Sequence, residues 1–312
     1  MTYIIATSNM KGGVGKTTLA VNLATCLASI HRKRVLVADF DAQISATLSL
    51  LSPQDFVKAR KEQRTLKYLF QGVLQPESSE KISVLDVIRP YVATVKGLDL
   101  LPGDLDLYDD FAVSSALHQL AEQSGQKDFQ VAWNQLEQTM VKSILDPVRH
   151  NYDYIILDCA PGYNLLTRSS LVNSDFYLLP AKAEPLSVAG IQLLERRIEK
   201  LRNTYKGTDI FKSRLVGIAF TMAGGLLTSR YSKQVIDRLH QDFSAAQIFK
   251  TQIPSDIHVS KAVDSFKPVI LTHPKSPGSK AFIQLTQEFL HKIEVLVGSK
   301  EQKSRLSLSE LD

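Results

Sequence analysis

The densest group of residues that could do chemistry is a glycine- and lysine-rich segment near the first residue. It reads Lys11, Gly12, Gly13, Val14, Gly15, Lys16, Thr17 and Thr18, between a β-branched run and a helical pattern. Glycines let backbone N–H groups turn inward around phosphate oxygens, because no Cβ blocks the approach, and the start of the next helix adds unpaired donors. The segment predicts a phosphate loop with Lys16 at the β- and γ-phosphates, Thr17 on Mg²⁺ and Thr18 beside the α-phosphate.

The match to the common phosphate-loop pattern is incomplete. The pattern G-x-x-x-x-G-K-[ST] wants glycine where this chain has Met10, and it does not need a second lysine such as Lys11. A glycine-rich turn that binds no nucleotide is the alternative. The triplet Gly15-Lys16-Thr17 between a strand and a helix argues against that alternative.

Carboxylates end two of the apolar runs. Asp39 and Asp41 come at the end of a run that begins at residue 34, and Asp158 ends the run at 154–157. Ligands of open α/β sheets bind at the carboxyl ends of the strands. An unpartnered buried carboxylate is costly and must face water or a cation, so we expect Asp158 to hold Mg²⁺ through a water and Asp39 to support its water shell. The alternative for Asp39 and Asp41 is two surface acids that cap the next helix.

Short apolar runs alternate with helical patterns along most of the chain. We expect strands near 3–7, 34–38, 98–101, 154–157, 176–179 and 215–220, and helices near 17–30, 55–64, 107–123, 129–148, 190–205 and 232–243. Continuous apolar runs suit strands that are buried on both faces of a parallel sheet. The sequence therefore predicts an α/β fold, a doubly wound, mostly parallel sheet with helices on both faces.

The chain is expected to form one domain. Residues 1–298 carry the strand–helix alternation, and the less regular stretch at about 52–150 is interpreted as a helical elaboration because no linker-like composition sets it apart. Residues 299–312 are polar and are expected to form a disordered tail.

The composition excludes several classes of protein. With 312 residues, 44% of them hydrophobic and 22% charged, the chain is not a disordered protein, a collagen or a coiled-coil rod. No apolar run approaches the roughly 20 residues of a membrane span, and no secretory signal pattern is found. The two cysteines, Cys26 and Cys159, fit a reducing compartment, and no Cys/His spacing predicts zinc. We expect Cys159 to pack as a small hydrophobic side chain.

Charge is unevenly distributed. The net charge is +5, and residues 201–299 contain 13 Lys and Arg against 7 Asp and Glu. This excess predicts a polyanionic partner, with a merely solvated surface as the alternative.

The loop with two lysines, together with the segments 35–43 and 154–162, resembles the deviant Walker A ATPases of the ParA/MinD family, in register to about residue 295. The resemblance implies the P-loop NTPase fold, hydrolysis of ATP with Mg²⁺, and an ATP-dependent homodimer. It implies that Lys11 reaches the partner's nucleotide and that Asp41 positions the attacking water. It further implies that Met222 and Pro254 line the adenine site.

The chain departs from the family pattern at two places. Ala42 replaces the proline of the D-x-D-P-Q segment, and His258 replaces an arginine before a Ser-x-Ala segment. Because the phosphate loop begins near the first residue, we expect no N-terminal helix-turn-helix, as in the shorter ParA-type, Soj-like members.

The resemblance also suggests what the ATPase controls. It implies nonspecific DNA binding, for which the candidate residues are Arg230, Lys233, Lys261 and Lys267. The expected protein is cytoplasmic and nucleoid-associated, and it positions a plasmid, a chromosome or a protein body with a ParB-like or cargo-adaptor protein that stimulates hydrolysis. The first alternative is a MinD-like, membrane-associated ATPase that regulates cell division, against which the lack of a terminal amphipathic helix counts. An iron–sulfur relative is a second alternative, but no pair of cluster cysteines presents itself.

Overall fold

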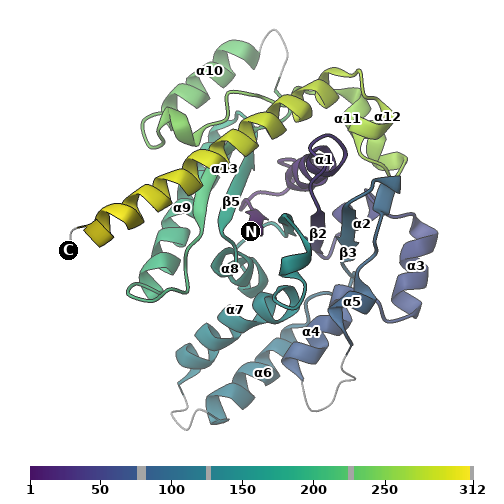
Figure 1. Ribbon diagram of the computed structural model, residues 1–312, viewed down its shortest axis with the longest axis vertical. Helices are drawn as coiled ribbons and strands as arrows, with labels where there is room; N and C mark the ends of the chain where they lie inside the picture. The colour runs from purple at the N-terminus through teal and green to yellow at the C-terminus, as the bar shows by residue number, and fades with distance from the viewer. Residues whose placement is uncertain (76–81, 124–127, 224–227, 310–312) are drawn as a thin grey trace.

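A six-stranded sheet forms the centre of the protein in the computed structural model (Figure 1), which describes residues 1–75, 82–123, 128–223 and 228–309. The strands are β1 (Tyr3–Thr7), β2 (Val35–Phe40), β3 (Leu98–Leu101), β4 (Tyr154–Cys159), β5 (Phe176–Ala181) and β6 (Arg214–Phe220). Their order is β3-β2-β4-β1-β5-β6, and neighbouring strands in this order pair in parallel. The predicted doubly wound parallel sheet is confirmed.

One face of the sheet is covered by helices from both ends of the chain. They are α1 (Lys16–Ser29), α11 (Ile257–Asp264), α12 (Val269–Thr272) and α13 (Pro277–Ser309), which runs diagonally across the molecule in Figure 1. Alternate strand residues such as Ile5 and Val37 point into this layer. Phe289 of α13 packs over the sheet with its ring centroid 6.0 Å from that of Tyr154.

The opposite face carries a larger helical layer. It consists of α4 (Leu66–Leu74), α6 (Asp110–Gln123), α7 (Phe129–Leu145), α8 (Leu165–Val172), α9 (Pro185–Thr204) and α10 (Thr228–Leu239). Helices α6 and α7 lie side by side (Figure 1). Ile4 and Leu36, the neighbours of the residues that face the first layer, point into this second core. Because successive strand residues are buried on opposite sides, the strands read as continuous apolar runs.

Short elements fill the connections. They are α2 (Ser45–Leu48), α3 (Pro53–Lys61), α5 (Val84–Val87) and the 3₁₀ turns η1 (Val92–Thr94), η2 (Arg149–Asn151) and η3 (Ala245–Gln247). The stretch 52–150 contains α3 to α7 and also β3, which is an edge strand of the main sheet.

The C-terminal segment, for which the sequence predicts a disordered tail, begins with helical backbone. Helix α13 continues to Ser309, so helical backbone enters the segment 299–312. That segment has no proline or glycine before Ser309 and contains Glu, Gln, Lys, Arg and Leu, which favour the helical state.

Candidate nucleotide site at the carboxyl edge of the sheet

The loop between β1 and α1 has the backbone of an anion cradle. Gly13 and Gly15 adopt left-handed φ angles of 69° and 81°, which residues with a Cβ rarely adopt. A Cβ built on Gly12 or Gly13 would meet nothing within 4 Å, so the space above the loop is open. Gly15 is the N-cap of α1, whose first N–H groups therefore face this space. Thr17 and Thr18 lie half-buried in the first turn of the same helix.

Neighbouring strands hold the loop in place. The Thr221 hydroxyl, just after β6, donates to the Val14 carbonyl at 2.7 Å. The Asn9 side chain donates to the Pro180 carbonyl at 2.7 Å and accepts the Lys11 backbone N–H at 2.9 Å. The sequence analysis did not single out Asn9, and only its position directly after β1 could have indicated its role.

Lys16 lies at the bottom of the cradle. Its side chain is buried, and Nζ donates to the Lys11 carbonyl at 3.2 Å. Burial lowers the pKa of Lys16, and the negative charges of Asp158 and Asp41 partly offset that effect. A triphosphate would supply the anionic partner that this ammonium group lacks.

Two predicted carboxylates meet across neighbouring strands. Asp39 of β2 and Asp158 of β4 are in register, and both are fully buried. Neither carboxylate oxygen of Asp158 accepts a hydrogen bond of full strength, although the Thr17 side chain lies near enough to lower the pKa of Asp158 slightly. Burial, followed by the nearby charge of Asp39, raises the pKa of Asp158 well above its usual value, and burial raises the pKa of Asp39 to about 6. The positive charge of Lys16 offsets these effects on Asp158 only in part, so a further cation would stabilise both carboxylates in their ionised form.

Magnesium fits this requirement. Among the described residues, no group of three or more His, Cys, Asp or Glu side chains is placed to hold a metal ion. Mg²⁺ commonly takes only one or two protein carboxylates and completes its shell with waters and phosphate oxygens. Asp158, with Asp39 beside it and Thr17 in the adjoining turn, is a donor set of that kind.

Asp41 lies at the mouth of the site. It follows β2, its side chain is 9% exposed, and its Oδ1 accepts the Gln43 N–H at 3.0 Å. Asp39 contacts the next helix, because its Oδ2 accepts the backbone N–H of Thr47 in α2. Asp39 therefore does bond to the next helix, as the alternative of a capping acid expects. It does so from a fully buried position, whereas the alternative expects a surface acid.

Lys11 points away from the loop that carries it. Its Nζ forms an ion pair with Glu184 at 2.9 Å, and both side chains are substantially exposed. Glu184 precedes α9 and follows β5, and the bond to Lys11 holds the pKa of Glu184 below its usual value. Glu184 was not among the site residues predicted from the sequence.

Met222 and Pro254 come together beside the loop. The segment after β6 pairs with residues 253–255 through an isolated bridge between Ala223 and Pro254. The Ala223 N–H donates to the Ile253 carbonyl at 2.9 Å, and the Ser255 N–H donates to the Ala223 carbonyl at 2.7 Å. Met222 has a left-handed φ of 55° and is about half exposed.

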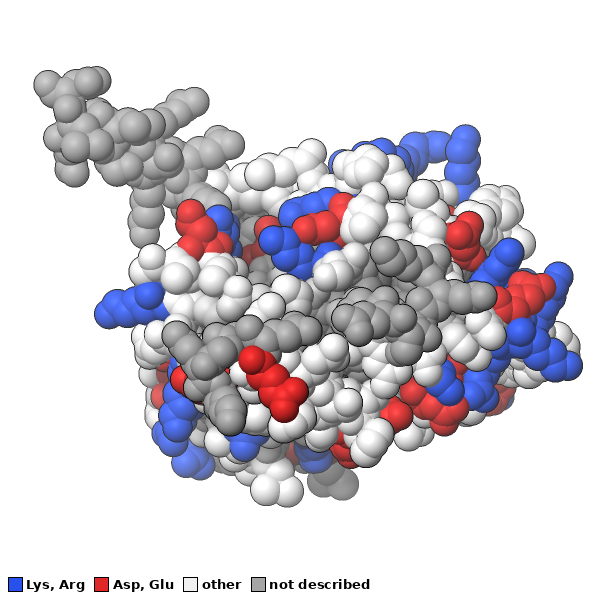
Figure 2. Space-filling model, turned by 90° about the horizontal axis from the view of Figure 1, so that it is seen from below, with Lys and Arg blue, Asp and Glu red and all other residues white. Residues whose placement is uncertain are grey.

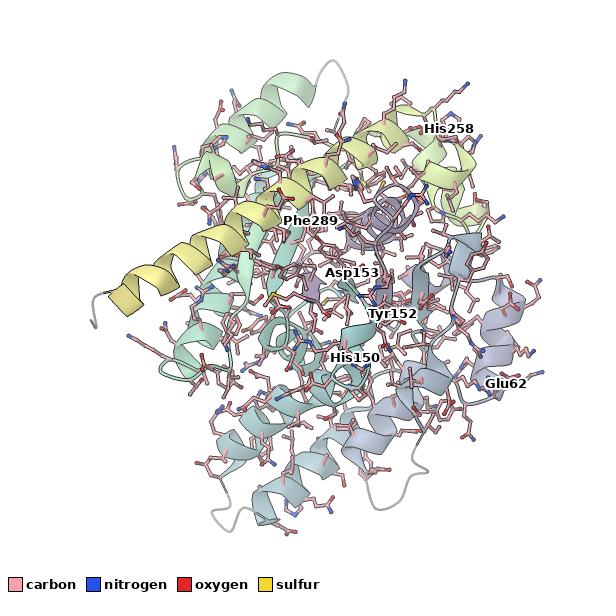
Figure 3. All side chains as sticks on the ribbon, in the orientation of Figure 1. Glu62, His150, Tyr152, Asp153, His258 and Phe289 are labelled. Carbon is pink, nitrogen blue, oxygen red and sulfur yellow. The ribbon has the colours of Figure 1, made fainter. Side chains whose placement is uncertain are left out.

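The four candidate DNA-contacting residues come from two parts of the fold. Arg230 and Lys233 belong to α10, although their side chains lie outside the described ones, whereas Lys261 is exposed on α11 and Lys267 is exposed before α12. Figure 1 shows α10 and the α11–α12 pair as separate parts of the upper edge. His258 lies on α11 (Figure 3). On the face shown in Figure 2, Lys and Arg are interleaved with Asp and Glu.

Two other expectations can be compared with the structure. Cys26 and Cys159 are both buried and unpaired, as expected of packed cysteines. Across the described part of the chain, no helix combines the length and the apolar character that a bilayer span requires.

Comparison with known proteins agrees with this geometry. A family model described as an AAA domain matches residues 2–210. The sporulation initiation inhibitor protein Soj of Bacillus subtilis is 32% identical over 288 residues, which cover 92% of this chain and 98% of Soj. The chromosome partitioning protein ParA of Caulobacter vibrioides is 30% identical over 290 residues, covering 92% of this chain and 93% of ParA.

Solved structures show the same fold at lower identity. The Cyanothece McdA(D38A)–ATP complex superposes with a TM-score of 0.69 at 20% identity, covering 93% of this chain and 96% of McdA. The Pyrococcus furiosus cell division ATPase MinD gives 0.62 at 22% identity and covers 95% and 100% of the two chains. Cobyrinic acid a,c-diamide synthase of Mycobacterium smegmatis with ADP and magnesium gives 0.66 at 20%, covering 94% and 96%. Because the last of these is a biosynthetic enzyme, the fold alone does not determine function.

Proposed function

Because this chain belongs to the ParA/MinD family of P-loop ATPases, we propose that it hydrolyses ATP as a switch between a monomer and an ATP-bound dimer. In this proposal the dimer binds DNA nonspecifically and positions or segregates a cargo. A ParB-like or cargo-adaptor protein stimulates hydrolysis and returns the protein to the monomer. The protein would act in the cytoplasm, in association with the nucleoid.

The observation that carries the ATPase proposal is the set of incompletely compensated charges around an open glycine loop. Lys16 and Asp158 are both buried and attract one another, but burial outweighs that attraction, because the pKa of Lys16 is lowered and that of Asp158 is raised. A magnesium-bound triphosphate has the charges that both groups need. Magnesium there would neutralise charge on the β- and γ-phosphates, and Thr17, Asp158 and Asp39 would hold it.

The remaining residues have proposed roles in hydrolysis. Asp41 lies close enough to Lys16 for their charges to interact, and it would orient a water molecule for attack on the γ-phosphate. The loop N–H groups and Lys16 would stabilise the charge that develops on the phosphate oxygens. Met222 and Pro254 would flank the base, since the bridge at Ala223 holds their segments together.

Lys11 supports the proposal of a dimer. The Lys11 side chain is exposed and bound only to Glu184, so it does not contribute to the phosphate loop of its own protomer. It is therefore available to the nucleotide of a second protomer. ATP buried between two protomers would stabilise the dimer through its higher affinity for that state, and hydrolysis would remove the difference.

A gel-shift assay with nonspecific duplex DNA tests the proposal, comparing no nucleotide, ADP and ATP. We expect a shift only with ATP, one that weakens steeply as salt is raised from 50 to 200 mM, because phosphate contacts release counterions. Lys16→Ala should lose both nucleotide binding and the shift.

Two outcomes would contradict parts of the proposal. ATP-dependent pelleting with anionic vesicles but not with DNA would favour the MinD-like alternative. Full ATP affinity in Lys16→Ala would show that the glycine loop is not the nucleotide site.

A further inference from the structure

Asp39 is fixed by an unusual set of bonds from one residue. Its Oδ2 accepts both the backbone N–H and the side-chain hydroxyl of Thr47, each at 2.7 Å. Its Oδ1 accepts the Asp41 N–H at 3.3 Å. Asp39 and Thr47 are both fully buried, so water does not compete for these bonds.

The orientation of the Thr47 hydroxyl is determined by its surroundings. The backbone N–H of Gly103 donates to Thr47 Oγ1 at 2.9 Å. A backbone N–H can only donate and an ionised carboxylate can only accept, so the one hydroxyl proton of Thr47 is directed at Asp39. The result is a chain of bonds from Gly103 through Thr47 to Asp39.

Gly103 also contacts Asp39 directly. A Cβ at this position would lie 2.9 Å from the Asp39 carbonyl oxygen and 3.1 Å from its carboxylate carbon. Both distances are shorter than ordinary contacts, and the backbone oxygen cannot move aside cheaply. The turn at residues 102–104 therefore packs against Asp39 at a distance that only glycine permits.

The same turn is attached to the helical layer. The buried Asp104 carboxylate accepts the Thr65 hydroxyl at 2.7 Å and lies 3.3 Å from the Arg60 guanidinium of α3. The Pro102 carbonyl accepts the N–H of Leu66, the first residue of α4, at 2.9 Å. The position of Asp39 is thus connected to α3 by an ion pair and to α4 by a hydrogen bond, both through the turn at 102–104.

We infer that Thr47 and Gly103 are positioning residues that hold Asp39 where it can support the magnesium of a bound nucleotide, and that α3 and α4 set this position through the turn at 102–104. We name this pair the Thr47–Gly103 brace. The inference rests on the proposed function, because it concerns the same nucleotide site.

The test begins with Thr47→Val, which keeps the shape of the side chain and removes the hydroxyl. Affinity for a nonhydrolysable ATP analogue is measured by calorimetry in EDTA and in Mg²⁺, and kcat and KM are measured separately. Loss of a hydrogen bond to a charged group corresponds to a change of roughly ten- to hundredfold. We expect the magnesium-dependent gain in affinity, and kcat, to fall by at least about tenfold, with affinity in EDTA unchanged.

Three further variants separate positioning from general stability. Thr47→Ser restores the hydroxyl and should return both measurements to near the wild-type values. Gly103→Ala keeps every hydrogen-bonding group but displaces Asp39, so it should lower the magnesium-dependent gain in affinity and kcat as Thr47→Val does. It also provides an independent test if Thr47→Val does not fold. Thr286→Val is the matched control, because it removes a buried hydroxyl of α13 that donates to the Phe282 carbonyl at 2.8 Å and contacts the Cys26 thiol of α1, and it should leave both measurements unchanged.

The possible results separate a failure of this inference from a failure of the proposed ATPase function. If Thr47→Val retains the magnesium-dependent gain and kcat, or if Thr47→Ser is equally impaired, the brace is wrong and the nucleotide site stands. If the wild-type chain shows no nucleotide affinity in either buffer, the proposed function is wrong and the inference falls with it.

Discussion

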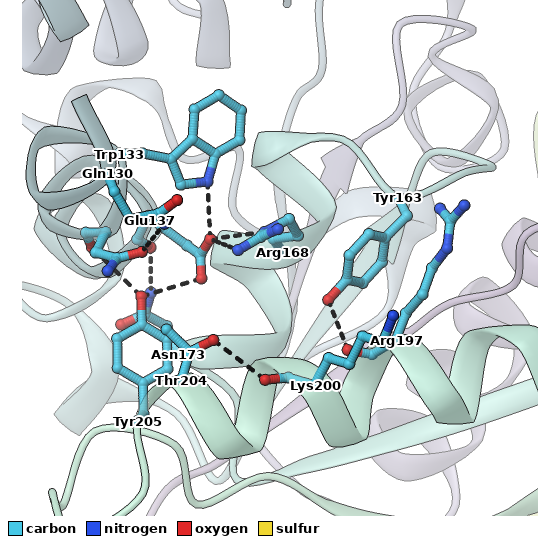
Figure 4. A network of polar contacts seen from close by, with 11 residues as sticks. Gln130, Trp133, Glu137, Tyr163, Arg168, Asn173, Arg197, Lys200, Thr204 and Tyr205 are labelled. Carbon is cyan, nitrogen blue, oxygen red and sulfur yellow. Dashed lines mark hydrogen bonds and ion pairs between the residues drawn. The ribbon is translucent and has the colours of Figure 1, made fainter.

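Two buried carboxylates in this protein lie in opposite kinds of environment. Glu137 of α7 is fully buried, and all its bonds come from the protein itself (Figure 4). Its Oε2 accepts the Arg168 guanidinium at 2.6 Å and the Trp133 indole N–H at 3.1 Å, and its Oε1 accepts the Tyr205 hydroxyl at 3.0 Å. Asp158 is equally buried, yet neither of its oxygens accepts a hydrogen bond of full strength.

The surroundings of Arg168 strengthen the first arrangement. Its guanidinium lies between two aromatic rings, 5.7 Å from the centroid of Trp133 and 5.4 Å from that of Tyr163. Charge and hydrogen-bonding capacity are both satisfied there, so the network needs no ligand. At the carboxyl edge the fold leaves charges only partly compensated. This contrast identifies the second region as the one that requires a bound cation and anion to be complete.

The largest expected effect concerns Glu137. Glu137→Gln would leave the mostly buried Arg168 guanidinium without its counter-ion, and breaking a buried pair in this way costs about 3 kcal/mol or more. We expect the free energy of unfolding, measured with urea, to fall by about that amount. Nucleotide affinity at 10 °C, where the variant remains folded, should be unchanged, and a Glu137→Gln chain as stable as the wild type would remove the basis of the comparison.

Asp158→Asn should change the free energy of unfolding in the opposite direction. Removing a buried charge that Lys16 compensates only in part, without changing the shape of the side chain, should stabilise the nucleotide-free protein by about 1–2 kcal/mol. Thermal unfolding in EDTA measures this, with Asp153→Asn as a control at a partly exposed carboxylate that is already paired with Arg34. A less stable Asp158→Asn chain would mean that the charge is fully compensated in the free protein.

The smallest effect on folding is expected at the exposed pair of Lys11 and Glu184. Glu184→Gln should change the free energy of unfolding by less than about 1 kcal/mol, as is usual for exposed ion pairs. Since it frees Lys11 for a partner protomer, the ATP-dependent dimer should tighten by up to about fivefold in sedimentation experiments. Glu199→Gln, which breaks the exposed pair with Arg202 on α9, is the control. A weaker dimer in Glu184→Gln would show that Glu184 itself contributes to the interface.

Much of the fold could be predicted from local sequence patterns. The strands at 3–7 and 98–101 were predicted with the bounds that the structure shows, because apolar β-branched runs between turn residues carry a local signal. The ends of β2, β4 and β5 were each predicted two residues too early. The polar residues of β2 and β4, Asp39 and Asp158, still pair within the sheet, which an apolar pattern cannot indicate.

The parts that could not be predicted depend on contacts between distant segments. The sequence analysis assigned no helix at 165–172 and none at 277–309, because the burial of α8 and α13 is determined by the layers they join. The ion pair of Lys11 with Glu184 and the bond between Thr47 and Gly103 join residues far apart in sequence. The motif identified the phosphate loop and the carboxylates, and the structure identified what holds them.

The central claim is that a magnesium-bound nucleotide completes the carboxyl edge of the sheet. The most direct test measures the unfolding temperatures of the wild type and of Asp158→Asn in the presence of an ATP analogue, with and without Mg²⁺. A ligand at 100 times its dissociation constant stabilises the folded state by about 2.7 kcal/mol. The account predicts that Mg²⁺ adds to the stabilisation by nucleotide in the wild type and adds little in Asp158→Asn. An equal addition by Mg²⁺ in both proteins would contradict it.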